Sequence, residues 1–262
     1  MDAVLFDLDG VLYQTDNPIR GAAAAVRWFR KRRIPHLFLT NTTSRPRAAL
    51  VEKLAAMGIA VEAEELLTPP VAAARWLQQH LRGPVALFVP EATRAEFAGL
   101  PELAAGVAQG AGAVVVGDLG SGWDFATLNR AFRLLMGEPR PVLVALGMTR
   151  YWRAEDGLRL DTGPFVTALA MASGVSPQVF GKPAAPFYEE ALALLGSAAE
   201  RTLMVGDDIR GDIEGAAGAG IRTLLVRTGK FRPADLTLGI HPDAVIDSVA
   251  ELPEWWAAQG SP

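Results

Sequence analysis

Five aspartates are the residues of this sequence best suited to chemistry. They form two groups far apart in the chain, Asp7 and Asp9 near one end and Asp207, Asp208 and Asp212 near the other. Several carboxylates in one crevice repel each other unless a cation joins them. Hard oxygen ligands without His or Cys suit Mg²⁺. The two groups therefore predict a Mg²⁺ site, provided that the fold brings them together.

Two further polar clusters lie between the aspartate groups. Thr40 and Asn41 follow an apolar segment, and Lys182 stands in the sequence Gly181-Lys182-Pro183. Lys182 supplies a positive charge, whereas Thr40 and Asn41 supply neutral hydrogen-bond donors. A metal ion, a lysine and hydroxyl donors are the groups that neutralise a transferring phosphoryl group. The combined chemistry is that of phosphate hydrolysis or phosphoryl transfer.

Each cluster alone has a simpler structural interpretation. An Asp-x-Asp-Gly sequence is often only a turn, and the further acidic positions of an EF-hand are missing. Thr40-Asn41 alone fits a helix cap, Gly181-Lys182-Pro183 a loop, and Gly206-Asp207-Asp208 a turn with an N-cap. All four clusters, however, follow apolar runs that look like strands. In a parallel sheet the carboxyl ends of the strands form the ligand crevice, so the four clusters are expected to converge there.

The elements that must position these residues alternate between strand and helix. Predicted strands are Val4–Phe6, His36–Leu39, Val85–Val89, Ala113–Val116, Val142–Leu146, Gln178–Phe180, Thr202–Val205 and Thr223–Val226. Predicted helices are Gly21–Arg33, Pro46–Met57, Pro69–Leu81, Glu91–Phe97, Phe125–Met136, Pro186–Leu195, Ile209–Ala217 and Ser248–Ala258. A hairpin turn is expected at Glu155-Asp156-Gly157. This alternation predicts an α/β protein built on a doubly wound parallel sheet.

Composition narrows the classes of partner and compartment. The 262 residues carry a formal net charge of −4, which gives no general attraction to nucleic acid or to an anionic membrane. There is no cysteine, and no apolar run reaches the roughly 18 residues that span a bilayer. The beginning of the chain lacks the basic region of a secretory signal, so a cytoplasmic location is expected. The basic run Arg30–Arg33 is interpreted as a solvated helix end.

Taken together, these motifs resemble those of the haloacid dehalogenase superfamily of phosphohydrolases. Its first motif corresponds to Asp7-Leu8-Asp9-Gly10-Val11 and its second to Thr40. The third motif corresponds to Lys182, and the fourth to Gly206-Asp207-Asp208 with Asp212. The resemblance covers essentially the whole chain and implies a Rossmann-like core with an inserted α/β cap domain.

The spacing of the motifs resembles subfamily IIA, whose members carry a type II cap. The expected domains are a catalytic core of residues 1–81 and 177–262 and a cap of residues 82–176. Within the subfamily, the chain most resembles the phospholysine phosphohistidine inorganic pyrophosphate phosphatase group, and NagD-like phosphatases are more distant. Members of that group often carry Ser at the position of Asp9. Asp9 restores the commoner superfamily pattern and weakens the transfer of that group's unusual substrates.

The resemblance also implies a role for each site residue. Asp7 is expected to be the nucleophile that forms an aspartyl-phosphate, and Asp9 the general acid and base. Mg²⁺ is expected on the Asp7 carboxylate, the Asp9 main-chain carbonyl and Asp207. Asp208 and Asp212 are expected to orient its waters, and the phosphate is expected on three further residues: Thr40, Asn41 and Lys182.

The expected function is thus Mg²⁺-dependent hydrolysis of small phosphorylated metabolites. The alternatives are a phospholysine, phosphohistidine or pyrophosphate hydrolase of the same family, a metal-free dehalogenase, and a phosphate-binding protein without catalysis. Asp9 and the acidic fourth cluster argue against the dehalogenase, and the presence of Asp7 and Lys182 argues against the binding protein. Relatives often dimerise through the cap, so a homodimer is also expected.

Overall fold

The computed structural model describes residues 1–154 and 156–260, and contacts divide it into two compact units. Unit 1 consists of Met1–Thr40, Arg47–Leu67 and the chain from Lys182 onward. Unit 2 consists of Asn41–Pro46 and Thr68–Gly181. Each unit has its own hydrophobic core, so each is described by itself.

A six-stranded parallel sheet forms the centre of unit 1. Its strand order is β14 (Ala244–Ile246), β13 (Arg222–Val226), β12 (Thr202–Gly206), β1 (Ala3–Asp7), β4 (His36–Leu39) and β5 (Leu66–Leu67). The chain proceeds from β1 to β4 on one side and from β12 to β13 on the other. The order therefore reverses between β1 and β12, and such a switch point opens a crevice at the carboxyl ends of the strands.

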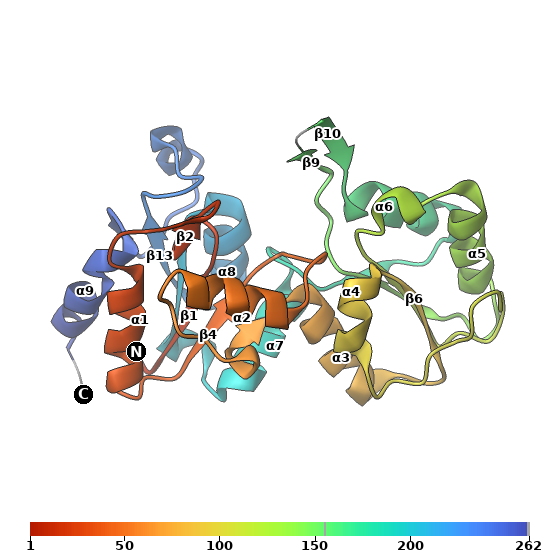
Figure 1. Cartoon of the computed structure of the whole chain (residues 1–262), viewed down its shortest axis with the longest axis horizontal. Helices are drawn as coiled ribbons and strands as arrows, with labels where there is room; N and C mark the ends of the chain where they lie inside the picture. Colours follow the sequence, from red (N-terminus) through yellow and green to blue (C-terminus); the bar gives the residue numbers. More distant parts are fainter. Residues whose placement is uncertain (155, 261–262) are drawn as a thin grey trace. The chain divides into compact units, whose positions relative to one another are not determined.

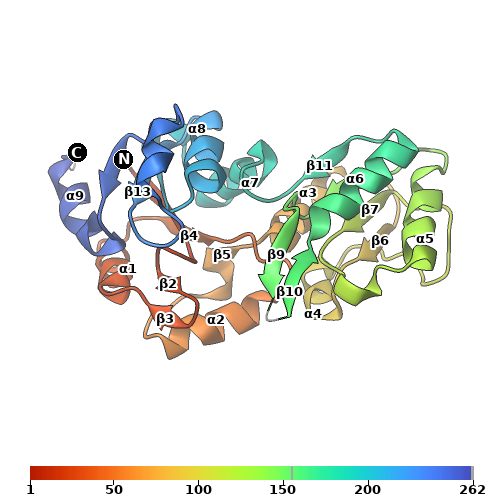
Figure 2. The same ribbon diagram turned by 90° about the horizontal axis from the view of Figure 1, so that it is seen from above.

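Helices cover both faces of this sheet, which explains why its central strands β1 and β12 are buried throughout. In β1, Val4 and Phe6 pack in the core cluster that includes Val26 and Phe29. Figure 2 shows α7 and α8 on one side of the sheet and α1 and α2 on the other. The helices of unit 1 are α1 (Ala22–Lys31), α2 (Arg47–Ala56), α7 (Ala185–Leu195), α8 (Gly215–Gly218) and α9 (Leu252–Ala258). A π-helical segment, Ile209–Glu214, leads into α8.

Unit 2 contains a second parallel sheet. Its strand order is β11 (Pro177–Val179), β8 (Val142–Ala145), β7 (Ala113–Val116) and β6 (Val85–Phe88). Its helices are α3 (Pro69–His80), α4 (Glu91–Arg94), α5 (Phe125–Leu135) and α6 (Thr162–Ser173). Strands β9 (Tyr151–Ala154) and β10 (Gly157–Leu160) pair antiparallel (Figure 1). Glu155, in the predicted turn, lies outside the described residues.

The predicted fold class is confirmed, with differences in detail. The eight predicted strands and the six predicted helices that correspond to α1–α5 and α7 are present within a few residues of their expected bounds, but helix α6 was not predicted. The prediction missed three short pairings: β5, β14 and the ribbon of β2 (Tyr13–Gln14) with β3 (Asn17–Pro18). The predicted helix Ile209–Ala217 is a π-helix followed by the short α8, and the closing helix α9 begins at Leu252.

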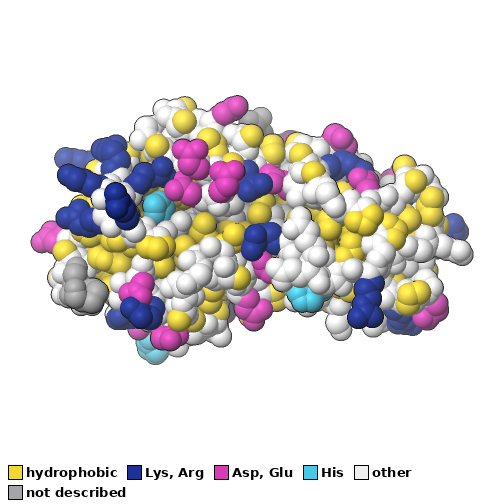
Figure 3. Space-filling view, turned by 90° about the horizontal axis from the view of Figure 1, so that it is seen from below, with side chains coloured by type: hydrophobic (Ala, Val, Ile, Leu, Met, Phe, Trp, Pro, Cys, Tyr) yellow, Lys and Arg dark blue, Asp and Glu magenta, His cyan; other side chains and the backbone are white. Residues whose placement is uncertain are grey.

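Basic side chains gather at the end of α1. Figure 3 shows dark blue side chains concentrated at the end of the surface that belongs to unit 1. Arg30 pairs with Glu65, and the Arg32 guanidinium lies 3.9 Å from the centre of the Trp28 ring. These local contacts agree with the interpretation of a solvated helix end. Among the described residues, no helix is both long and apolar enough to cross a membrane.

Candidate active site

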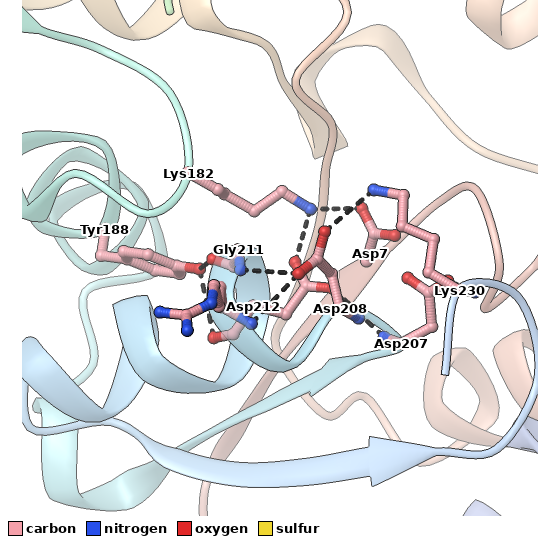
Figure 4. A network of polar contacts seen from close by, with 9 residues as sticks. Asp7, Lys182, Tyr188, Asp207, Asp208, Gly211, Asp212 and Lys230 are labelled. Atoms are coloured by element: carbon pink, nitrogen blue, oxygen red, sulfur yellow. Dashed lines mark hydrogen bonds and ion pairs between the residues drawn. The ribbon is translucent and has the colours of Figure 1, made fainter. Parts of the chain in front are cut away.

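Three buried carboxylates meet at the switch point of the unit 1 sheet. Asp7 ends β1, Asp207 follows β12 directly, and Asp212 lies in the π-helical segment. Each offers a carboxylate oxygen, and these three oxygens lie within 4.8 Å of one another. The structure therefore brings together aspartates from both sequence groups, as Figure 4 shows.

Lys182 joins two of these carboxylates. Its side chain is only 6 % exposed, and its Nζ donates to Asp7 Oδ1 and, over 2.6 Å, to Asp212 Oδ1. Burial acts to lower the pKa of Lys182, but the Asp212 and Asp7 carboxylates raise it well above its ordinary value. The ammonium ion is therefore a permanent positive charge beside Asp7.

The lysine does not fully compensate the burial of the acids. Burial raises the pKa of Asp7 to about 8 despite the opposing effect of Lys182, and neighbouring Asp212 and Asp207 contribute to the rise. Burial likewise raises the pKa of Asp207 to about 6. An additional cation would favour the ionised forms of both carboxylates, because an opposite charge nearby stabilises a buried anion.

One oxygen of Asp207 is available to such a cation. Asp207 Oδ2 accepts a hydrogen bond from the Lys230 main-chain N–H over 2.5 Å. Asp207 Oδ1 is buried and has no hydrogen-bond partner among the described residues. A buried, unpaired carboxylate oxygen is costly unless a ligand satisfies it. The donor set of hard oxygens with one unsatisfied anion therefore fits Mg²⁺.

Asp212 and Asp208 are committed to holding the fourth-motif loop. Asp212 Oδ2 accepts from the main-chain N–H groups of Asp207 and Asp208, each over 3.1 Å. Asp208 Oδ1 accepts from the N–H groups of Arg210 and Gly211 and so caps the π-helical segment. Burial acts to raise the pKa of Asp208, but the Gly211 N–H and Lys230 lower it overall.

Two glycines make room for the Asp207 carboxylate. Gly10 has a φ of +95°, and a Cβ added there would lie 2.0 Å from Asp207 Oδ2. Gly229 has a φ of +66°, and its added Cβ would also lie 2.0 Å from Asp207 Oδ2. Thr228 Oγ1 donates to the Gly10 carbonyl, which joins the two segments. Only glycine fits these positions, because both the backbone conformation and the space exclude a side chain.

Tyr188 connects the lysine segment to the acidic loop. This residue of α7 is fully buried, and its hydroxyl donates to the carbonyl of Gly211 at 2.7 Å, with the Asp212 carbonyl at 3.2 Å. Burial raises the pKa of Tyr188 well above its usual value, so the hydroxyl remains a donor. Tyr188 was not predicted as a site residue, and neither were Gly229 and Lys230, which follow the predicted strand Thr223–Val226. Gly229 and Lys230 follow the strand that comes next after Asp207 in the sequence, and this order was the signal that could have identified them.

The remaining predicted site residues lie at different places. Asp9 is exposed and follows Asp7 by two positions, in the turn after β1. Thr40 is buried directly after β4, whose Leu39 lies opposite Asp7. Asn41 is described within unit 2, where its Oδ1 lies beside Gly181. The geometry thus brings together Asp7, Lys182 and the three acids of the fourth motif, which are Asp207, Asp208 and Asp212. Thr40 lies at the end of the neighbouring strand β4.

Carboxylates and a buried lysine thus lie at the switch point of a parallel α/β sheet, which is where α/β enzymes bind their ligands. A family model described as haloacid dehalogenase-like hydrolase matches residues 4–100, and one described as HAD-hydrolase-like matches residues 179–252. The chain is 36 % identical to human phospholysine phosphohistidine inorganic pyrophosphate phosphatase over 256 residues, which cover 95 % of this chain and 91 % of the relative. The chain belongs to the haloacid dehalogenase-like hydrolase family.

Solved structures agree with this assignment. A hypothetical protein from Pyrococcus horikoshii OT3 matches with a TM-score of 0.89 and 28 % identity, covering 98 % of this chain and 100 % of the other. A p-nitrophenyl phosphatase from Archaeoglobus fulgidus matches with a TM-score of 0.86 and 28 % identity, covering 97 % and 98 % of the two chains. The resemblance inferred from the four motifs is therefore confirmed.

Proposed function

We propose that this protein is a phosphatase that hydrolyses small phosphate monoesters with Asp7 as its nucleophile. The observation that carries the proposal is the environment of Asp7, which contacts the Lys182 ammonium and lies in a carboxylate cluster with Asp207, whose buried Oδ1 has no partner among the described residues. A nucleophilic carboxylate must attack an anion, and this is feasible only where positive charge surrounds the transferring group. The human relative and the A. fulgidus protein are both named as phosphatases, which supports the same reaction.

The reaction proceeds in two displacements. In the first, an Asp7 carboxylate oxygen bonds to phosphorus, and the bond from phosphorus to the leaving oxygen breaks while Asp9 gives that oxygen a proton. In the second, Asp9 takes a proton from water, whose oxygen attacks phosphorus, and Asp7 leaves as a free carboxylate. The second step returns to Asp9 a proton in place of the one that it gave up in the first, so the residue is ready for the next turnover.

The other residues bind and neutralise the transferring group. We assign the phosphate oxygens to Thr40, Asn41 and Lys182. Asp7, the Asp9 main-chain carbonyl and Asp207 would hold Mg²⁺, and when bound it would supply further neutralisation of phosphoryl charge. Asp208 and Asp212 hold the loop on which Asp207 lies and would orient the waters of the metal.

The substrate class and setting belong to the same proposal. Residues 82–176 are proposed to act as the cap of a core formed by 1–81 and 177–262, which favours small metabolites over bulky polymers. A cytoplasmic location and a homodimer are proposed as well. The second candidate function is hydrolysis of phospholysine, phosphohistidine or pyrophosphate, which the name and 36 % identity of the human relative favour. Asp9 favours ordinary monoesters, because their alkoxide leaving groups require a general acid.

A screen of phosphorylated metabolites with and without Mg²⁺ tests the proposal. The protein should be inactive after chelation and regain activity with Mg²⁺ but poorly with Ca²⁺, whose larger and looser shell does not suit a compact site. Asp7→Asn should remain folded and lose turnover by up to about a million-fold. If the purified, folded variant keeps more than a tenth of wild-type activity, Asp7 is not the nucleophile. Full activity in excess chelator would contradict the metal requirement.

A further inference from the structure

Lys230 is an exposed cation beside an otherwise acidic centre. The chain has four lysines, and two of them, Lys182 and Lys230, reach the carboxylates of the site. Their situations differ sharply, because the Lys182 side chain is 6 % exposed and the Lys230 side chain is 66 % exposed. Figure 4 shows both ammonium groups on the side of Asp7.

The charge of Lys182 is already used by the protein itself. Its ammonium donates to Asp7 and Asp212 at the same time. An ammonium has three donors, and at least two of those of Lys182 are already used by these carboxylates. The positive charge of Lys182 is therefore largely compensated by these two carboxylates, and an anionic substrate would need a further cation.

Lys230 has donors to spare. Its main-chain N–H holds Asp207 Oδ2, which any non-proline residue could do. Among the described residues, its side chain makes one ion pair, from Nζ to Asp208 Oδ2 over 3.1 Å. Asp208 does not depend on that pair for its position, because its Oδ1 is already held by the N–H groups of Arg210 and Gly211. A pair with a partly exposed carboxylate is weak, so an incoming anion can displace it.

We propose that the Lys230 ammonium is a second contact for the anionic part of the substrate, paired with Asp208 when the site is empty and with substrate oxygens when it is filled. This inference rests on the proposed phosphatase function and extends it to a substrate class. Phosphate esters with a second anionic group, and pyrophosphate, gain most from a second cation. Lysine suits the role because its flexible stem carries a compact point charge.

The experiment compares Lys230→Met with Lys230→Arg and with the control Arg227→Met. Arg227 lies on the same segment but pairs with Asp247, so its removal changes the net charge equally without touching the centre. Three quantities are measured on the purified full chain: the inhibition constant of inorganic phosphate, kcat and KM for p-nitrophenyl phosphate and pyrophosphate, and Mg²⁺ binding by calorimetry without substrate.

Lys230→Met should weaken phosphate inhibition about tenfold and raise KM, more for pyrophosphate than for p-nitrophenyl phosphate, because a contact between opposite charges is lost. Mg²⁺ should bind more tightly, by about fivefold, because a nearby positive charge is removed. Lys230→Arg should restore phosphate binding, and Arg227→Met should change none of the three. Opposite changes for the anion and the cation are the signature of a charge contact.

Two results would overturn the inference. Unchanged phosphate inhibition and KM in Lys230→Met would make Lys230 an ordinary surface lysine. Equal weakening of phosphate and Mg²⁺ binding would mean that the side chain only maintains the loop. If the wild-type protein hydrolyses no phosphate compound, the proposed function is rejected instead. In that case, direct measurements of phosphate and Mg²⁺ binding to Lys230→Met still test the role of Lys230.

Discussion

At the scale of single residues, burial holds the pKa values of two aspartates of the site above the ordinary value of that side chain. Burial raises the pKa of Asp7 to about 8 and that of Asp207 to about 6. Lys182 is the buried cation that opposes this effect at Asp7. Since a metal ligand must be deprotonated, a cation that binds these carboxylates has to displace protons. Metal binding and pH are therefore linked through the same two side chains.

Mg²⁺ affinity should rise with pH up to about 8, because above that pH Asp7 is ionised even before a metal ion binds. An unfolded aspartate has a pKa of about 3.9, so folding raises the pKa and the folded state binds the proton more tightly. Protonated Asp7 contributes its full stabilisation of the folded state below about pH 4, and this stabilisation is lost as pH rises through about 8. The metal-free protein should therefore become less stable over this range, while added Mg²⁺ stabilises it increasingly.

Thermal unfolding at pH 6, 7 and 8, with and without Mg²⁺, measures both trends. Asp7→Asn is the control, since it removes the group that titrates near 8 and should flatten the dependence between pH 7 and 8. A stabilisation by Mg²⁺ that is the same at all three pH values would contradict the coupling to Asp7.

Asp9 should matter in proportion to the basicity of the leaving group. An alkoxide that leaves from a sugar phosphate needs a proton, whereas a nitrophenolate can leave without one. Asp9→Ser should therefore lower kcat/KM for alkyl phosphates by roughly a hundred- to ten-thousand-fold and for p-nitrophenyl phosphate far less. The ratio kcat/KM is the correct measure because it reports the steps up to transfer to Asp7. Equal proportional losses would leave Asp9 with a structural or metal-positioning role.

At the scale of elements, the loop after β13 and the turn after β1 close together around Asp207. Thr228 donates to the Gly10 carbonyl, and the Lys230 N–H fixes Asp207 Oδ2. Gly10 and Gly229 leave room for the carboxylate between the two segments. The position of the Asp207 carboxylate thus depends on how two strand ends meet, and not on Asp207 alone.

Gly229→Ala should disrupt this closure. The added Cβ would lie 2.0 Å from Asp207 Oδ2 and 2.5 Å from Gly10 Cα, so the carboxylate or the loop must move. A displacement of about 1 Å in a catalytic group can cost about a hundredfold in rate, and that loss is expected in kcat. Calorimetric Mg²⁺ binding should weaken as well.

Gly239→Ala is the matched control for this substitution. Gly239 has a φ of +76°, close to the +66° of Gly229, but an added Cβ there meets no atom within 4 Å. Both variants therefore carry a similar backbone strain, of about 1 kcal/mol, and only Gly229→Ala meets the carboxylate. Equal effects of the two variants on activity would show that backbone strain, and not the position of Asp207, is responsible.

The accuracy of the sequence-based predictions depended on the length and pattern of each element. The long buried strands and the clusters that follow them were predictable, because apolar runs such as Val4–Phe6 and Thr202–Val205 are unambiguous and parallel strands end at one edge. Strand β5 has two residues and β14 three, too few for any period to be recognised. Tyr188 resembles any core residue of an amphipathic helix until the Gly211 carbonyl is seen beside its hydroxyl. Such contacts depend on tertiary packing, which no local pattern encodes.

At the scale of the whole molecule, the chain builds two hydrophobic cores that do not share residues. The core cluster of unit 1 contains Phe6, Phe29 and Leu203, and that of unit 2 contains Phe88, Val114 and Leu143. The proposed metal ligands Asp7, Asp9 and Asp207 all lie in unit 1. A ligand stabilises only the cooperative unit whose folded form it binds. The effect of Mg²⁺ should therefore be confined to one part of the chain.

Hydrogen exchange followed by mass spectrometry can locate that effect. At a Mg²⁺ concentration of about one hundred times Kd, binding adds about 2.7 kcal/mol to the stability of the unit that binds it, which slows exchange through unfolding by about a hundredfold. This slowing is expected in β1 and β12 of unit 1, whereas β6 and β7 of unit 2 should exchange at an unchanged rate. Asp7→Asn should abolish most of the protection in unit 1 and leave unit 2 as it is. If Mg²⁺ instead slows exchange in β6 and β7 by the same factor as in β1, the two units unfold as one cooperative body in spite of their separate cores.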